Sequence, residues 1–170
     1  MTMGIAISLE QYLSDQGIAY DALRHDRTEC AAESAAVGNI PGASMAKAVV
    51  LNCRDGHVLA VVPASRQVQL EKVGRCIKQP VSLAIETELA SLFPDCEAGA
   101  VPPVGAAYGL RTVVDDSLEA QKDIYFEAGD HRTLVHVRGD EFLRLMRSVS
   151  HGRICAENGK LTDETIYWGA

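Results

Sequence analysis

The residue with the most chemical potential in this sequence is Lys47, a lone cation near the start of an apolar run. The run spans residues 46–52 and reads AKAVVLN. Burying an ammonium group there is costly unless the charge is paired or used. One interpretation is a strand-edge lysine whose stem covers apolar surface while its charge reaches solvent. The other is a cation that faces a cleft and holds a phosphate or polarises an ester carbonyl. Composition favours the first and leaves the second open.

A second candidate is a stiff loop between Glu97 and Gly105, with the sequence EAGAVPPVG. Gly99 allows the backbone to approach a ligand closely, whereas Pro102 and Pro103 restrict the chain. The N–H groups of such a loop are suitable for stabilising an oxyanion. A tight connection between a helix and a strand explains the same residues equally well.

A third candidate is the segment Gly129-Asp130-His131, which lies between two predicted strands. A glycine–aspartate turn is sufficient to explain it structurally. The functional alternative is that His131 contacts a substrate or acts as an acid–base group. The pattern alone does not choose between them.

Several enzyme classes leave no signature in the chain. There is no P-loop, no dinucleotide-binding fingerprint, no His-Glu-x-x-His and no Gly-x-Ser-x-Gly. The cysteines and histidines do not fall at zinc-ligand spacings, so we expect neither a metal nor another cofactor. Nothing resembles a Ser-His-Asp triad, and no cysteine stands in an electropositive setting. A covalent acyl-enzyme is therefore not expected.

Composition sets the broad class. The 170 residues are 47% hydrophobic and 23% charged, which predicts one globular domain with a real core. A net charge of −7 argues against a protein that coats nucleic acid non-specifically, although it allows a local basic patch. Five scattered cysteines, no secretory leader and no long apolar run predict a soluble, cytoplasmic protein with reduced thiols.

The elements that must position the three candidates are short. A hairpin is the clearest, because two apolar β-branched runs flank Asp55-Gly56, and their continuous hydrophobicity predicts central strands covered on both faces. Ser8 and Gln11 form a capping-box pattern that predicts the start of a first helix, which Gly17 would end. The remaining predicted helices cover residues 29–37 (capped by Thr28), 69–77, 86–93 and 140–147. The predicted strands cover residues 19–23, 46–52, 58–62, 112–114, 124–126 and 134–137. This mixture predicts an α+β or mixed α/β fold.

Taken in order, these segments resemble the YbaK/ProX family of aminoacyl-tRNA editing domains, which also occurs as an insertion in bacterial prolyl-tRNA synthetases. The similar segments are AKAVVL, LAVVPA, LFPDCEAGAVPPVG, TVVDDSL and IYFEAGDH. The resemblance covers residues 8–148 of a single domain spanning 1–170, and it leaves 149–170 as a C-terminal extension with no assigned role. It implies a YbaK-like domain with a central mixed, mostly antiparallel sheet flanked by short helices.

The resemblance also implies an activity. Members hydrolyse the ester that joins a wrong amino acid to the 3′ end of tRNA, so we expect a free-standing deacylase that acts in trans on a small amino acid. The family's lysine falls on Lys47 and its G-x-x-x-P loop on Gly99 to Pro103. The expected catalytic residues are Lys47, Gly99 and Ala100. The expected substrate-binding residues are Val101, Pro102, Pro103, Gly105, Gly129 and His131.

Two groups of cations are candidate contacts for tRNA phosphates. Residues 131–153 carry five arginines against two carboxylates, and Arg144 and Arg147 are the chosen contacts there. Lys72, Arg75 and Lys78 recur at three-residue spacing on a predicted helix. For any single residue of these groups, an ordinary solvated face is the favoured explanation, and only the groups as sets indicate phosphate contact.

The expected partner is the acceptor end of mischarged tRNA, with a synthetase or an elongation factor as a further partner, and neither DNA nor a membrane. Two other functions stay open. One is a non-catalytic module that binds an aminoacyl or nucleotide ligand or docks on a synthetase. The other is a hydrolase of a different small amino-acid ester.

Overall fold

A long antiparallel hairpin forms the centre of the computed structural model, which describes residues 4–28, 34–36 and 38–156. Its strands are β2 (Met45–Cys53) and β3 (Gly56–Pro63), with Ala46 opposite Pro63 and Cys53 opposite Gly56. Val58 to Pro63 are all buried. The predicted central hairpin, covered on both faces, is confirmed.

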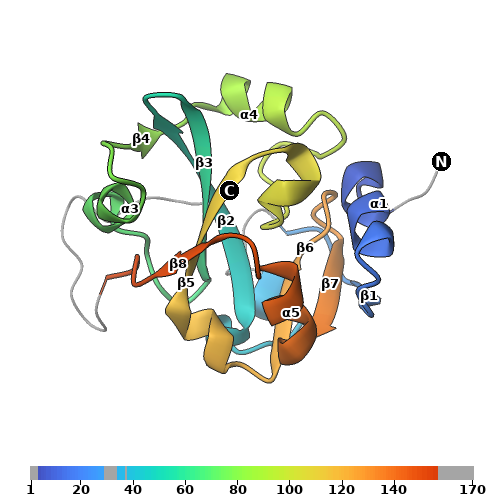
Figure 1. The fold of residues 1–170 in the computed structure, drawn as a ribbon. Helices are drawn as coiled ribbons and strands as arrows, with labels where there is room; N and C mark the ends of the chain where they lie inside the picture. The colour runs from blue at the N-terminus through green and yellow to red at the C-terminus, as the bar shows by residue number, and fades with distance from the viewer. Residues whose placement is uncertain (1–3, 29–33, 37, 157–170) are drawn as a thin grey trace.

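The hairpin lies within an eight-stranded sheet (Figure 1). The order is β1-β7-β6-β2-β3-β5-β8, and β4 pairs with β2 beside this path. Four of the pairings are antiparallel and three are parallel, which confirms the mixed, mostly antiparallel sheet. The other strands are β1 (Asp21–Arg24), β4 (Ser82–Leu83), β5 (Arg111–Asp115), β6 (Asp123–Glu127), β7 (Thr133–Arg138) and β8 (Ser150–Gly152).

Short helices cover both faces of the sheet. They are α1 (Ile7–Asp15), α3 (Leu70–Ile77), α4 (Glu86–Leu92) and α5 (Gly139–Leu145), with 3-10 turns η1 (Gly42–Ser44), η2 (Gly105–Tyr108) and η3 (Asp116–Ala120). Alternate residues of β2 belong to two different core clusters, because successive side chains of a strand point to opposite faces. One cluster contains the buried side chains of α1 and α5, and the other those of α3. Helix α3 therefore lies on the opposite face from α1 and α5 (Figure 1).

Helix α1 confirms the first predicted helix but not the predicted capping box. The residue at its N-cap is Ala6, which makes no side-chain cap, and Ser8 lies inside the first turn. The backbone N–H of Ser8 donates instead to Asp95 Oδ2 at 2.7 Å. A carboxylate distant in sequence thus replaces the local cap, since an anion at a helix N-terminus is stabilised by the helix dipole.

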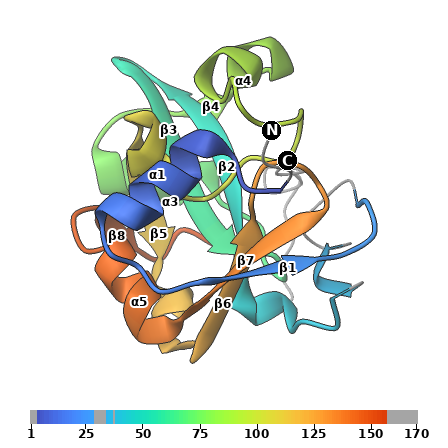
Figure 2. The same cartoon turned by 90° about the vertical axis from the view of Figure 1, so that its right-hand side faces the viewer.

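Both ends of the chain add to the sheet. Strand β1 runs along its outer edge beside β7 (Figure 2). At the other edge, β8 pairs with β5, so the first residues after 148 form part of the fold. Most of the helix predicted over residues 29–37 lies outside the described residues, as do residues 157–170. Among the described helices, none has the length and apolarity needed to cross a membrane.

Candidate functional site

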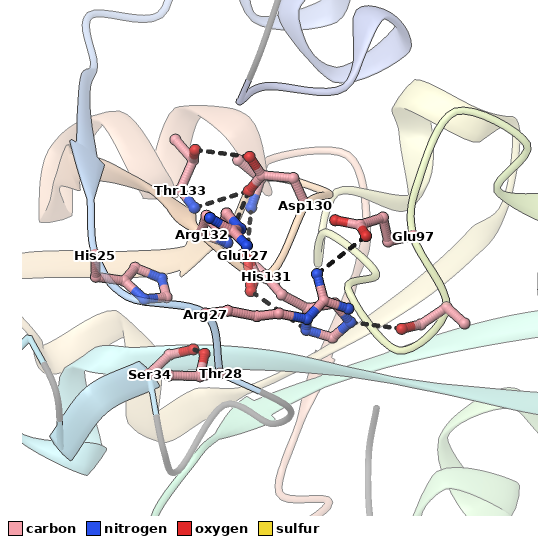
Figure 3. Close-up of polar contacts among 12 residues, drawn as sticks. His25, Arg27, Thr28, Ser34, Glu97, Glu127, Asp130, His131, Arg132 and Thr133 are labelled. Carbon is pink, nitrogen blue, oxygen red and sulfur yellow. Dashed lines mark hydrogen bonds and ion pairs between the residues drawn. The ribbon is translucent and has the colours of Figure 1, made fainter.

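The structure brings two of the three candidate segments together: the loop over residues 97–105 and the turn over residues 128–131. The N–H of Glu97 donates to the carbonyl oxygen of Gly129 at 2.8 Å. The Nε2 atom of His131 lies 2.5 Å from the carbonyl oxygen of Ala98 (Figure 3). A carbonyl only accepts, so His131 donates through Nε2. The turn therefore holds the first residues of the loop at two points.

The turn itself is held in an unusual backbone conformation. Gly129 has a φ of +124° and His131 a φ of +62°, which is uncommon for a residue with a side chain. A Cβ on Gly129 would lie 3.0 Å from the Cβ of Ala6. Asp130 closes the turn by accepting the N–H groups of Arg132 and Thr133 at 2.9 and 2.8 Å. The Gly-Asp pattern thus forms the predicted turn, and it also fixes the direction of His131.

Glu127, the last residue of β6, faces the same histidine from inside the protein. Its Oε1 lies 4.0 Å from His131 Nδ1, and the two side chains are 12% and 1% exposed. Burial raises the pKa of Glu127 to about 7, and the nearby charges of Asp130 and Glu97 add to the effect. The sequence analysis missed this residue. The available signal was an acidic residue that ends an apolar strand four positions before His131.

Lys47 lies on β2, half-buried and opposite Val62 of β3. The parallel pairing of β2 with β6 matches Met45 to Tyr125 and Ala46 to Phe126. Extended by one residue, this register brings Lys47 beside Glu127 on one face of the sheet. The lysine strand thus runs next to the strand that leads into the turn.

Some N–H groups of the loop already donate hydrogen bonds within the protein, whereas others do not. The N–H of Ala100 donates to the carbonyl oxygen of Glu97 at 3.0 Å, which closes a tight turn within the loop. Gly99 has a φ of +80°. Within the described part of the chain, neither the N–H of Gly99 nor that of Val101 has a hydrogen-bond acceptor. These two groups are therefore among the donors that the loop can offer to a ligand.

The remaining loop residues are packed into the protein. Val101, Pro102 and Pro103 are buried. Gly105 is also buried, and a Cβ there would lie 2.1 Å from Thr112 Oγ1 of β5. This glycine permits the loop to pack against the sheet. Its predicted contact with substrate stays a prediction.

A polar cluster supports the loop from behind. Asp95 accepts the hydroxyl of Tyr108 at 2.9 Å as well as the N–H of Ser8. The ring of Tyr108 packs against Phe93, with centroids 4.6 Å apart. Burial raises the pKa of the neighbouring Cys96 thiol to about 12, so this cysteine stays protonated and is no nucleophile.

The segment after β1 forms a further wall. The N–H of Thr28 donates to the carbonyl oxygen of His131 at 3.1 Å. Arg27 Nη1 pairs with Glu97 Oε1 at 3.0 Å, which ties this segment to the loop (Figure 3). The hydroxyls of Thr28 and Ser34 lie 2.5 Å apart. Three stretches distant in sequence therefore meet around His131.

The two predicted tRNA-binding groups do not meet, since α3 and α5 lie on opposite faces of the sheet. On α3, Arg75 pairs with Glu71, and Lys72 Nζ donates to the carbonyl oxygen of Cys155 at 3.0 Å. Lys78, the C-cap of α3, is exposed. On the other face, Arg144 pairs with Glu141 at 2.9 Å, and Arg147 is exposed.

One further cluster offers metal-ligand atoms, outside the site just described. Asp116, Glu119 and His151 bring one such atom each within 4.8 Å of one another. His151 already uses both ring nitrogens, with Nδ1 on Glu119 at 2.5 Å and Nε2 on the carbonyl oxygen of Met146 at 2.8 Å. The imidazole is therefore committed to contacts within the protein.

Comparison with known proteins gives the same picture of the domain. The family model described as the aminoacyl-tRNA editing domain matches residues 25–145. A proposed trans-editing enzyme for prolyl-tRNA synthetase superposes with a TM-score of 0.78 at 22% identity, covering 89% of this chain and 97% of that one.

Two further solved structures have the same fold. A hypothetical protein gives a TM-score of 0.78 at 22% identity, covering 88% of this chain and 99% of that one. A scaffold from epitope-grafting design gives 0.79 at 23% identity, covering 89% and 97%. No curated protein is similar enough in sequence to match.

Proposed function

Because the chain belongs to the aminoacyl-tRNA editing domain family, we propose that it is a free-standing deacylase that hydrolyses the ester of a tRNA mischarged with a small amino acid. The observation that carries this proposal is the clamp between turn and loop. His131 and Gly129 hold Ala98 and Glu97, and the next N–H groups of the loop include those of Gly99 and Val101, which have no acceptor among the described residues.

Ester hydrolysis requires a water nucleophile, a stabilised oxyanion and a positioned substrate. We assign the oxyanion to the N–H groups of Gly99 and Val101. Ala100 contributes by shape, since its own N–H closes the turn onto Glu97. A donor that is already oriented does not have to reorganise as charge develops on the carbonyl oxygen. Water then attacks the carbonyl carbon directly, without an acyl-enzyme.

Lys47 supplies the positive charge in this scheme. Its position beside the end of β6 supports a role in holding the terminal adenosine or adding positive potential near the carbonyl. His131, whose Nε2 is bound to the carbonyl oxygen of Ala98, has its Nδ1 4.0 Å from Glu127 Oε1. We assign to it the contact with the amino group of the substrate.

Selection of a small amino acid follows from the packing of the loop. The buried residues Val101, Pro102 and Pro103 limit the space beside the oxyanion donors. One methylene in an apolar pocket is worth only about 1–3 kcal/mol, which is why a synthetase benefits from a second, smaller site. The similarity to a proposed trans-editing enzyme for prolyl-tRNA synthetase suggests the first substrate to test. It is the tRNA for proline charged with a wrong, small amino acid.

The decisive experiment is a panel of mischarged tRNAs assayed for release of the amino acid. We expect the wild type to release a small amino acid, and Lys47→Ala to lose at least about a hundredfold in kcat/KM, the scale of one lost electrostatic contact in a transition state. The exposed Lys122 offers a matched control, and Lys122→Ala should keep its activity.

Two results would overturn the proposal. Binding of the tRNAs without release of any amino acid would indicate a non-catalytic module. Hydrolysis confined to small amino-acid esters that carry no tRNA would indicate the other hydrolase. Full activity of Lys47→Ala would contradict the role given to Lys47 and would leave the rest of the proposal unchanged.

A further inference from the structure

A second polar site lies on the face of the sheet that carries α3. It is a hollow of about 400 Å³ lined by three cations, Arg66, Lys72 and Arg153, together with the acidic pair Asp115 and Asp116. The three cations come from different elements: the segment after β3, helix α3 and the segment after β8. Figure 1 shows β8 and the chain that follows it beside α3. The fold therefore assembles this cluster, and no sequence spacing indicates it.

The cations keep donors available in the hollow. Arg66 is half-buried and Arg153 exposed, and within residues 34–36 and 38–156 neither has a carboxylate at ion-pair distance. The ammonium of Lys72 donates one hydrogen bond to the carbonyl oxygen of Cys155, and its two other N–H groups remain available as donors. In this respect the three differ from Arg75 and Arg144, which are paired with Glu71 and Glu141.

The two carboxylates at the hollow both have partners within the protein. Asp115 is buried and accepts the N–H groups of Ser117 and Ile154 at 3.1 and 2.9 Å. Asp116 directs an oxygen toward Glu119 and His151. These hydrogen bonds hold the carboxylates in place without removing their charge, so three cations face two carboxylates in the hollow. The hollow therefore carries a small excess of positive charge, in a protein whose net charge is −7.

The hollow is connected electrostatically to Lys47. Burial raises the pKa of the Cys155 thiol, and the positive charges of both Arg66 and Lys47 oppose that rise. Lys47 is opposite Val62 in the β2–β3 hairpin, and Arg66 follows the end of β3 by three residues. Both cations thus act on the Cys155 thiol, Arg66 from the hollow and Lys47 from the candidate site.

We propose that Arg66, Lys72 and Arg153 bind two or three backbone phosphates of the tRNA acceptor end while the aminoacyl ester lies near Lys47. This inference rests on the proposed function and names the surface that receives its substrate. Concave clusters of cations concentrate the field that attracts phosphate, and neutralising phosphates supplies most of the affinity for nucleic acid. The hollow keeps Lys72 from the predicted group on α3 and replaces the other predicted tRNA contacts.

The test compares two double variants with equal charge loss. Arg66→Gln/Arg153→Gln removes two of the hollow cations, whereas Arg54→Gln/Arg111→Gln removes two exposed arginines outside it. The ligand is an acceptor-stem RNA hairpin carrying a small amino acid through a non-hydrolysable amide, and binding is followed by fluorescence anisotropy over a range of salt. We expect roughly tenfold weaker binding for the hollow variant, with a salt slope reduced by about 0.7 for each lost phosphate contact. The control pair should bind like the wild type.

A charge-preserving variant separates a phosphate contact from a structural role. Arg66→Lys should retain most of the affinity if charge is what matters. Hydrolysis of an aminoacyl ester of adenosine, which carries no phosphate, should be equal in the wild type and in the hollow variant.

The outcomes distinguish the two proposals. A wild type that deacylates, with both double variants binding the RNA equally, overturns the phosphate site and leaves the proposed function standing. Salt-independent binding of the RNA by the wild type also overturns the site. A wild type that binds the RNA through the hollow and hydrolyses no mischarged tRNA overturns the proposed function instead.

Discussion

His131 and Glu127 form the most unusual pair of side chains in the described structure. The histidine is buried, has a left-handed backbone conformation and donates a hydrogen bond from one ring nitrogen to the loop. A non-glycine residue in that conformation is strained and persists where its surroundings impose it. Such strain together with a buried acid beside the ring is typical of functional sites. The residue types alone predicted His131 as a candidate, whereas Glu127 became visible through its distance to the ring.

Replacing Glu127 by glutamine should make stability less dependent on pH. Because the folded protein raises the pKa of this carboxyl from 4.5 to about 7, it binds the proton more tightly than the unfolded chain does. Stability is therefore highest below the unfolded pKa and is lost as pH rises toward 7. The full loss is about 3 kcal/mol. The free energy of unfolding of Glu127→Gln should thus rise relative to that of the wild type as the pH increases from about 5 to about 8.

Urea unfolding at a series of pH values checks this expectation. Glu86→Gln on α4 is the matched control, because its side chain is exposed and neutralising it should change little. Parallel pH curves for the wild type and Glu127→Gln would contradict the assignment of a buried, hard-to-ionise carboxyl.

At the scale of elements, the β6–β7 connection does more than reverse the chain. The carbonyl oxygen of Gly129 accepts the N–H of Glu97. Because Gly129 has no Cβ, Ala6, the residue before α1, can pack closely against it. The hairpin at β2–β3 and most helices follow from local pattern. The start of α1 does not, because its cap is Asp95, a residue 87 positions away from Ser8.

Gly129→Ala should impair both stability and activity. The φ of +124° is unfavourable for any side chain, and the new Cβ would crowd Ala6 and Cys96. We expect a loss of roughly 1–3 kcal/mol in the free energy of unfolding, with a lower kcat as the loop shifts. The control is Gly109→Ala, at a positive φ with open space around it. It should cost about 1 kcal/mol and leave kcat unchanged. An active, stable Gly129→Ala would show that the turn does not hold the loop.

At the scale of the whole molecule, the charge of −7 limits how this protein meets RNA. A few cations on a largely acidic body favour brief binding at one place over general coating of a nucleic acid. The two helix faces singled out by charge spacing are on opposite sides of the sheet, so they do not form one binding surface.

Deacylation should consequently show a modest salt dependence. With two or three phosphate contacts at a slope of about 0.7 each, kcat/KM should fall roughly tenfold from about 50 to about 200 mM salt, with kcat nearly constant. Initial rates at subsaturating and saturating tRNA measure both quantities, and an aminoacyl ester of adenosine is the salt-insensitive control. A drop of several thousandfold would contradict this small number of contacts.

Those parts of the protein that depend on local chemistry and pattern could be predicted from the order of the residues. Alternation of strands and helices predicted the mixed sheet, the Asp-Gly turn predicted the hairpin, and the ordered segments around Lys47, Gly99 and His131 indicated the family. Which of these groups meet became clear from the folded chain. The Ala98–His131 contact, the Glu127 pair, the Asp95 cap and the cluster of Arg66, Lys72 and Arg153 all join residues from separate elements. Their energies depend on distance and desolvation, and a linear order of residues specifies neither.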